Sequence, residues 1–206
     1  MTLRQWLLRH QREIVFTQSR WMGVLAYKNP FDAWIYQEIL YDVRPQLIVE
    51  IGSARGGSTL YLAHLLDLIG EGEVVSVDID HSKFEARHPR ISTVTGNSSA
   101  PEIVDRVRER ASGKRVLVIH DADHRKRQVL LDLEAYAPLV SPGSYLIVED
   151  GILDLFDRGD SIGTGEPGPL AAVEEFLPGH PEFEIDEARE RYLLTYNPRG
   201  FLKRRG

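Results

Sequence analysis

Acidic side chains directly follow two apolar segments in the middle of the sequence. Asp121 and Asp123 lie just after residues 116–119, and Glu149 and Asp150 follow residues 145–148. Carboxylates that lie close together repel one another or take up protons unless a cation neutralises them. Because oxygen ligands suit hard ions and the chain has no cysteine, we expect magnesium or a similar ion at this place.

A glycine-rich segment, EIGSARGGST at residues 50–59, opens with an acid. Gly52, Gly56 and Gly57 lie between an apolar run and a predicted helix, where glycine allows positive φ and close approach of a ligand. The spacing differs from the G-x-G-x-x-G of dinucleotide enzymes, and Glu50 would repel a pyrophosphate. The segment therefore predicts a ligand with a cationic end.

Polar residues at the ends of the next two predicted strands extend this site. Asp78 could accept hydrogen bonds from ribose hydroxyls, and Asn97 and Ser98 could meet the edge of an adenine. A nucleoside with a positive charge and an amino acid tail fits these places, which predicts S-adenosylmethionine as cofactor. The candidate cofactor-binding residues are Glu50, Gly52, Ser53, Gly56, Gly57, Ser58, Asp78, Asn97, Ser98 and Asp121.

A divalent ion beside a methyl donor indicates a specific reaction. The ion can coordinate a substrate hydroxyl, lower its pKa and hold its oxygen in line with the methyl group, which favours O-methylation. His124 and Lys126 follow Asp123 closely and are the candidate bases. N-capping of the following helix is the alternative role for Asp123. His120 is expected to be a buried polar group with a partner.

The elements that must position these residues alternate along the chain. Apolar strands separated by helices are typical of a doubly wound α/β fold with a mostly parallel sheet covered on both faces. The predicted strands are residues 46–51, 73–77, 91–95, 116–119 and 145–148, and the predicted helices are residues 58–69, 101–111 and 125–139.

The two ends of the chain depart from this alternation. Residues 1–44 predict a helical cap, with an amphipathic first helix and a second helix at 31–43. The glycine-rich residues 150–168 predict an active-site lid. After a helix at 169–176, residues 183–185 and 192–196 predict a closing antiparallel pair, and residues 201–205 are expected to end in solvent.

Composition bounds the possible functions. A chain of 206 residues with 42% hydrophobic residues predicts a single domain, residues 1–206. No apolar run is long enough to span a bilayer and the N-terminus lacks the pattern of a secretory signal, so we expect a cytoplasmic protein. The net charge is −6 and basic residues gather at the two ends. A body that is still more acidic argues against nucleic acid as a partner.

Five segments together resemble the cephalosporin hydroxylase family, a name that covers S-adenosylmethionine-dependent methyltransferases, including rhamnosyl O-methyltransferases. The resemblance implies a class I methyltransferase fold and a magnesium ion held by Asp123, Glu149 and Asp150. It also implies that Phe201 is a packing anchor. Residues 123–126 also resemble the D-H-x-K stretch of catechol-type O-methyltransferases, which implies Lys126 as the base, before His124. The segments are RPQLIVEIGSARGGSTLYLA, VVSVDID, VIHDADHRKRQVLLDLEAYAPLVSPGSYLIVEDG, GPLAAVEEFL and LLTYNPRGFLKR.

The preferred hypothesis is a magnesium-dependent O-methyltransferase that acts on a hydroxyl of a small molecule, with a sugar or glycosylated natural product as the leading acceptor. Three alternatives remain: an oxidative β-lactam-tailoring enzyme, a nucleoside-binding module without catalysis, and a nicotinamide-dependent dehydrogenase. Aromatic residues are frequent in residues 1–36, so we also expect a homo-oligomer.

Overall fold

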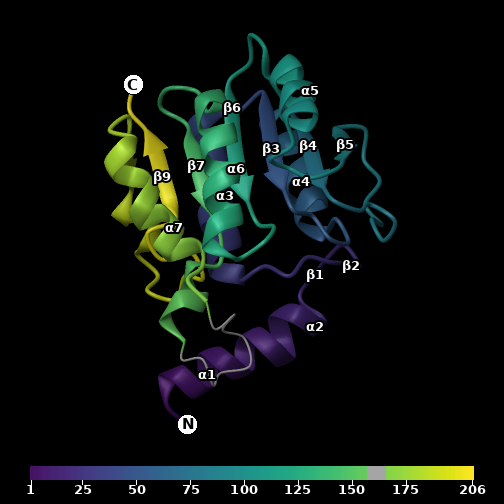
Figure 1. Ribbon diagram of the computed structural model, residues 1–206. Helices are drawn as coiled ribbons and strands as arrows, with labels where there is room; N and C mark the ends of the chain where they lie inside the picture. The colour runs from purple at the N-terminus through teal and green to yellow at the C-terminus, as the bar shows by residue number, and fades with distance from the viewer. Residues whose placement is uncertain (157–165) are drawn as a thin grey trace.

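The computed structural model describes residues 1–156 and 166–206, and within them the chain forms a seven-stranded sheet (Figure 1). The strand order is β5-β4-β3-β6-β7-β9-β8. All neighbours are parallel except that β9 runs antiparallel to β7 and β8. The strands are β3 (Leu47–Ile51), β4 (Glu73–Asp78), β5 (Ile91–Thr95), β6 (Val116–His120), β7 (Tyr145–Val148), β8 (Phe183–Ile185) and β9 (Phe201–Arg204).

Helices cover both faces of the sheet, as the alternating sequence pattern predicted. One apolar core joins the sheet to α5 (Pro101–Ala111), α6 (Lys126–Tyr136) and α7 (Pro169–Phe176). A second core joins the opposite face to α3 (Pro30–Val43) and α4 (Gly57–Ile69). The strands β3, β6 and β7 have no exposed residue. Burial on both faces explains why their sequences are continuously apolar until the acids begin.

Short 3-10 turns complete the described elements of this body. One of them follows directly after Glu149 and Asp150. The turns are η2 (Ala137–Leu139), η3 (Gly151–Leu155), η4 (Leu177–Gly179) and η5 (Glu187–Glu190).

The predicted closing pair is half wrong. β8 forms at residues 183–185, but its partner is β9, and residues 192–196 are not a strand. That segment is instead bound to α3, because Asp32 accepts hydrogen bonds from the Thr195 hydroxyl at 2.6 Å and the Tyr196 N–H at 2.8 Å. The expected solvated end is wrong for residues 201 and 202, and Phe201 is fully buried in the core shared with α3 and α4, which confirms it as a packing anchor. The basic residues that follow it concealed the strand.

The N-terminal segment lies at the end of the molecule toward which β6 and β7 point (Figure 1). It is helical, as predicted, and then forms a small hairpin that the sequence pattern did not indicate. The middle of the predicted lid at 150–168, residues 157–165, lies outside the described residues, and its first part forms a 3-10 turn at Gly151–Leu155. The N-terminal elements are α1 (Leu3–Arg9), the π-helix η1 (His10–Val15), α2 (Phe16–Gln18), β1 (Arg20–Trp21) and β2 (Val24–Leu25).

Across residues 1–156 and 166–206, none of the helices combines the length and the apolar composition that crossing a bilayer requires.

Candidate active site

The sheet register brings the acid-bearing strand ends together. The Asp121 N–H donates to the Ile51 carbonyl at 2.7 Å, and the Glu149 N–H donates to the His120 carbonyl at 2.9 Å. The first residue after β6 therefore lies next to the end of β3, and the first residue after β7 lies next to the end of β6. Parallel pairing thus places all three loops at one edge, where ligands bind in open α/β sheets.

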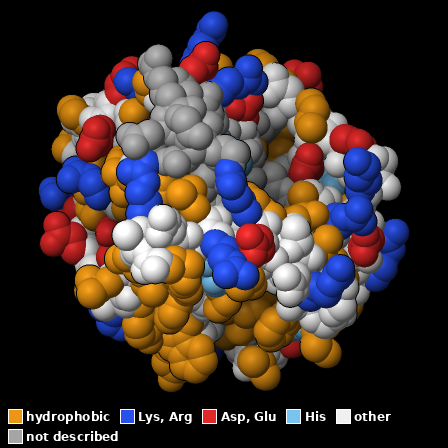
Figure 2. Space-filling model, turned by 90° about the horizontal axis from the view of Figure 1, so that it is seen from below, with side chains coloured by type: hydrophobic (Ala, Val, Ile, Leu, Met, Phe, Trp, Pro, Cys, Tyr) orange, Lys and Arg blue, Asp and Glu red, His pale blue; other side chains and the backbone are white. Residues whose placement is uncertain are grey.

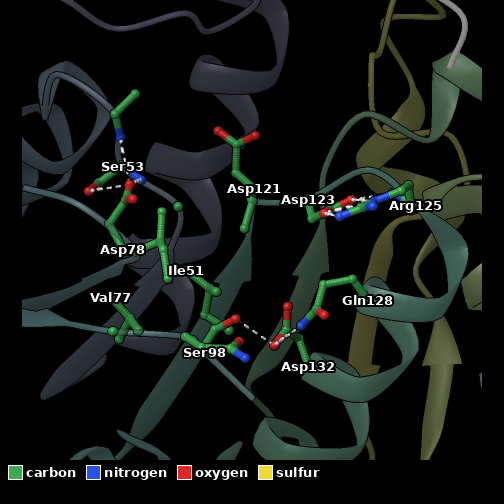
Figure 3. A pocket seen from close by; sticks show the side chains of 16 residues that line it. Ile51, Ser53, Val77, Asp78, Ser98, Asp121, Asp123, Arg125, Gln128 and Asp132 are labelled. Carbon is green, nitrogen blue, oxygen red and sulfur yellow. Dashed lines mark hydrogen bonds and ion pairs between the residues drawn. The ribbon is translucent and has the colours of Figure 1, made fainter. Parts of the chain in front are cut away.

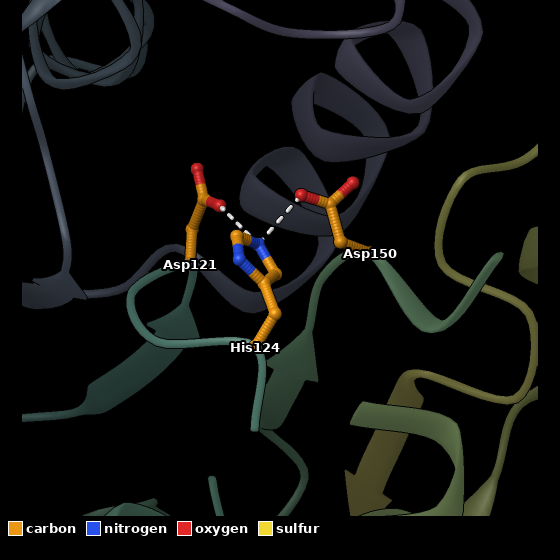
Figure 4. A group of neighbouring side chains, drawn as sticks. All are labelled: Asp121, His124 and Asp150. Carbon is orange, nitrogen blue, oxygen red and sulfur yellow. Dashed lines mark hydrogen bonds and ion pairs between the residues drawn. The ribbon is translucent and has the colours of Figure 1, made fainter. Parts of the chain in front are cut away.

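Asp121, His124 and Asp150 converge at this edge (Figure 4). Their ligand atoms lie within 4.8 Å of one another, and no other group of this kind occurs in the described part of the chain. His124 Nε2 lies 2.9 Å from Asp150 Oδ2 and 3.9 Å from Asp121 Oδ1. Burial opposes protonation of the imidazole, but the charges of Asp150 and Asp121 outweigh it and raise the pKa of His124 to about 9.

A buried lysine connects Asp121 to the acid that precedes Asp150. The Lys28 ammonium contacts Asp121 Oδ2 and lies 2.6 Å from Glu149 Oε2. The Tyr36 hydroxyl donates to Glu149 Oε1 at 2.7 Å. Burial raises the pKa of Glu149 to about 8, helped by the charge of Asp121 and opposed by Lys28. Burial alone would disfavour the ammonium, but the surrounding carboxylates raise the pKa of Lys28.

Asp123 does not join this group, although the sequence predicted it as a metal ligand with Glu149 and Asp150. Its carboxylate accepts from the Arg125 side chain at 3.0 Å and from the Arg125 N–H at 2.8 Å. The Arg125 hydrogen bonds lower the pKa of Asp123 to about 2. Asp121 and Asp123 point in different directions (Figure 3). β6 ends at His120, so the two-residue alternation of a strand does not continue to Asp123.

The two candidate bases also separate. His124 lies between Asp121 and Asp150, whereas the Lys126 ammonium lies 2.5 Å from Glu175 on α7. Lys126 begins α6, and this placement directs it toward the neighbouring helix. The geometry therefore favours His124 as the base, in reverse of the order that the D-H-x-K resemblance implied.

A cavity of about 550 Å³ adjoins the acid group (Figure 3). It lies over the ends of β3, β4, β5 and β6, and it is large enough for a nucleoside cofactor. Asp121 lines this cavity and also belongs to the acid group. The predicted cofactor-binding residues that line it are Gly52, Ser53, Asp78, Asn97, Ser98 and Asp121.

The glycine-rich loop is held by the protein itself. Asp78 Oδ2 accepts hydrogen bonds from the N–H groups of Ser53 at 2.8 Å and Ala54 at 3.0 Å. A Cβ on Gly52 would lie 1.9 Å from the Asp121 carbonyl oxygen, and one on Gly57 would lie 2.2 Å from the Leu25 carbonyl oxygen. These close backbone contacts require glycine at both positions, independently of any bound ligand.

Four predicted cofactor-binding residues do not line the cavity: Gly56, Gly57, Ser58 and Glu50. Gly56 is the N-cap of α4 and packs against the Phe84 ring, while Ser58 is buried in the first turn. Glu50 is fully buried, and its Oε2 accepts from the Thr59 hydroxyl. Among the described residues, Glu50 Oε1 has no hydrogen-bond partner. Burial raises the pKa of Glu50, against the charge of Lys28.

Sequence reasoning missed two polar residues of the site. Asp132 lines the cavity, accepts from the Ser98 hydroxyl at 2.7 Å, and lies 3.0 Å from His120 Nε2, which confirms the expected partner of His120. Asp132 shares a helix face with Val129, Leu133 and Tyr136, so a buried acid on an apolar face was a usable signal. The second missed residue is Lys28, because no periodic pattern in the sequence indicated that its side chain points into the protein.

Comparison with known proteins decides the family. The family model described as Rhamnosyl O-methyltransferase/CmcI matches residues 13–205. The chain belongs to this family. A rhamnosyl O-methyltransferase of Mycobacterium leprae (strain TN) is 37% identical over 198 residues, which cover 93% of this chain and 85% of the relative. One from Mycobacterium bovis (strain BCG / Pasteur 1173P2) is 34% identical over 93% of this chain and 80% of its own length.

Solved structures confirm the fold of this rhamnosyl O-methyltransferase/CmcI family member. A structure of CmcI with Mg and SAM aligns with a TM-score of 0.69 at 22% identity, covering 91% of this chain and 76% of that one. The methyltransferase MycE in complex with Mg, SAH and mycinamycin VI aligns with a TM-score of 0.55 at 20% identity, covering 86% of this chain and 47% of that one. The class I methyltransferase fold predicted from the sequence is confirmed.

Proposed function

We propose that this family member is an S-adenosylmethionine- and Mg²⁺-dependent O-methyltransferase that acts on a hydroxyl of a sugar or glycosylated small molecule. One observation carries the proposal: Asp121 is shared between the nucleoside-sized cavity and the acid group. A methyl donor and a divalent ion would therefore lie side by side. The relatives named as rhamnosyl O-methyltransferases support the acceptor class, and the CmcI structure with Mg and SAM supports the cofactors.

The residues present fit S-adenosylmethionine. The cavity has acceptor groups for ribose and adenine in Asp78 and Asn97, and the buried Glu50 has a carboxylate oxygen without a hydrogen-bond partner among the described residues. A buried carboxylate oxygen without a partner is costly, and a cationic ligand nearby would offset that cost. We therefore assign Glu50 an electrostatic role behind the glycine-rich loop.

The residues present also fit Mg²⁺, which prefers carboxylate oxygens and retains bound waters. We propose Asp121, Glu149 and Asp150 as its ligands, because Asp121 and Glu149 share the Lys28 ammonium and Asp121 and Asp150 share His124. When bound, the ion would lower the pKa of the acceptor hydroxyl and orient its oxygen.

His124 then has a defined task in methyl transfer. Only the neutral imidazole can accept the proton of the acceptor hydroxyl, so proton transfer requires a deprotonated ring, whose pKa the neighbouring acids raise, against the effect of burial, to about 9. A bound donor would supply the methyl group to the acceptor oxygen and leave as S-adenosylhomocysteine. Asp150, at 2.9 Å from Nε2, orients the ring and stabilises the imidazolium that forms.

We also propose that the protein self-associates through its N-terminal segment. Hydrophobic side chains gather on part of the face seen from below (Figure 2). Exposed apolar side chains of this segment include Leu3, Ile14, Phe16 and Met22. Light scattering after gel filtration should report an oligomer that Phe16→Ser combined with Met22→Ser dissociates. A monomeric wild type would contradict it.

Transfer of a labelled methyl group tests the main proposal. Wild-type protein with labelled S-adenosylmethionine, Mg²⁺ and a panel of rhamnosides should yield a methylated ether, and a chelator should abolish the product. Calorimetry should detect binding of S-adenosylhomocysteine but no binding of NAD. Donor binding without transfer to any glycoside would instead favour a binding module, and turnover with iron and 2-oxoglutarate would favour the oxidative alternative.

A further inference from the structure

The strongest unexplained feature of the site is the internal position of Lys28. Its side chain is only 7% exposed, and its ammonium contacts carboxylates at the ends of two strands, Asp121 after β6 and Glu149 after β7. The described contacts of Lys28 thus join two of the three carboxylates that we propose as metal ligands. A lysine so deeply buried is uncommon unless it is paired.

The backbone around Lys28 is built to hold it there. Tyr27 has a φ of 53°, a left-handed conformation that is unfavourable for a bulky residue. The Lys28 carbonyl accepts from the Ser19 hydroxyl at 3.0 Å, and the next residue, Asn29, is the N-cap of α3. The Asn29 amide also donates to the Leu194 carbonyl at 2.8 Å. These contacts fix the chain on both sides of Lys28 and direct its side chain inward.

The charges at this place conflict with a simple metal cage. A divalent ion bound by Glu149 needs an oxygen that the Lys28 ammonium contacts, because Lys28 contacts both Oε1 and Oε2. At Asp121 the ammonium contacts Oδ2, and Oδ1 faces His124. Two cations a few ångströms apart also repel each other strongly in a partly buried site. Lys28 must therefore either shift away from these oxygens or weaken the ion that binds beside it.

We infer that Lys28 is a positioning residue whose ammonium supplies a fixed positive charge at the metal site. It holds Asp121 and Glu149 together and competes with the divalent ion for them, which keeps metal binding weak and exchangeable. The inference rests on the metal site of the proposed function and adds that Lys28 lowers the affinity of this site for the ion.

Calorimetric titration with MgCl₂ alone tests this inference on the wild type, Lys28→Met and Lys28→Gln. Removing the ammonium should tighten Mg²⁺ binding at least about tenfold. A purely structural role would leave the affinity unchanged or weaken it, and either result would overturn the inference. Lys114→Met is the matched control, because Lys114 pairs with Glu73 at 2.6 Å at the opposite edge of the sheet.

Thermal unfolding gives a second readout. In chelator, both Lys28 variants should melt below the wild type, because two buried carboxylates lose their cation. With saturating Mg²⁺ the difference should shrink, and an undiminished difference would overturn the competition. If no protein binds Mg²⁺, the metal site of the proposed function fails, and the inference fails with it.

A measurement on the wild type covers the case in which the variants do not fold. In ¹⁵N-labelled protein, a buried ammonium exchanges slowly and gives a signal separate from those of exposed lysines. Addition of Mg²⁺ should shift or broaden the Lys28 signal. A signal that stays unchanged while Mg²⁺ binds would contradict the inference.

Discussion

The active-site edge has two halves that are ordered in different ways. The donor half is the cavity over the ends of β3, β4 and β5, and the reaction half is the acid group around Asp121 and Asp150. On the side of the cavity over β4 and β5, carboxylates are satisfied by neutral donors: Asp78 by loop N–H groups and Asp132 by the Ser98 hydroxyl. Around the acids, order depends on charge, with Lys28 and His124 placed between carboxylates. The donor half is therefore preformed by backbone geometry, whereas the reaction half is held by ion pairs that a bound cation would rearrange.

The largest effect should come from the residue that both halves share. Asp121→Asn should lower methyl transfer about a thousandfold, because it removes a proposed metal ligand. S-adenosylhomocysteine affinity, measured by calorimetry, should change much less. Asp123→Asn is the matched control and should retain nearly full activity, since Asp123 pairs with Arg125. The reverse ranking would restore the ligand set that the family resemblance implied.

The second-largest effect is expected on stability, where Gly52 of the donor half packs closely against the Asp121 backbone. Gly52→Ala should lower the free energy of unfolding by about 3 kcal/mol or more, because its Cβ would lie 1.9 Å from the Asp121 carbonyl oxygen. Urea denaturation measures it. Gly179→Ala has nothing within 4 Å of the added Cβ and should be nearly neutral. Equal stability of the two variants would refute the contact.

The base can be assigned within the reaction half. His124→Gln should lower kcat about a hundredfold, whereas Lys126→Met should change it less than about threefold, because Lys126 pairs with Glu175. Steady-state kinetics with saturating Mg²⁺ compares them. A large loss in Lys126→Met alone would reinstate the lysine as base.

The smallest effect should separate the donor half from the metal. Glu50→Gln should weaken S-adenosylmethionine binding about tenfold through loss of its charge, without lowering Mg²⁺ affinity. Asp105→Asn is the control, since Asp105 is exposed on α5 and pairs with Arg108. Calorimetry measures both ligands. Unchanged donor affinity would mean that Glu50 has only a structural role.

The sequence predicted most of the sheet because its central strands are apolar on both faces and end in acids. The error at residues 192–196 arose because an apolar, aromatic segment was bound by Asp32 rather than by a strand. The site was predicted less completely. Strand periodicity could not follow the chain beyond His120, where Asp121 and Asp123 diverge, and nothing local revealed that Lys28, far away in sequence, turns inward.

The central claim is that one divalent ion binds where the two halves meet. Anomalous diffraction from crystals grown with Mn²⁺ and S-adenosylhomocysteine tests it most directly. We predict a single strong peak within about 2–2.5 Å of carboxylate oxygens of Asp121, Glu149 and Asp150, next to the donor product in the cavity. A peak at Asp123, or no peak at this edge while the donor product is bound, would contradict the account.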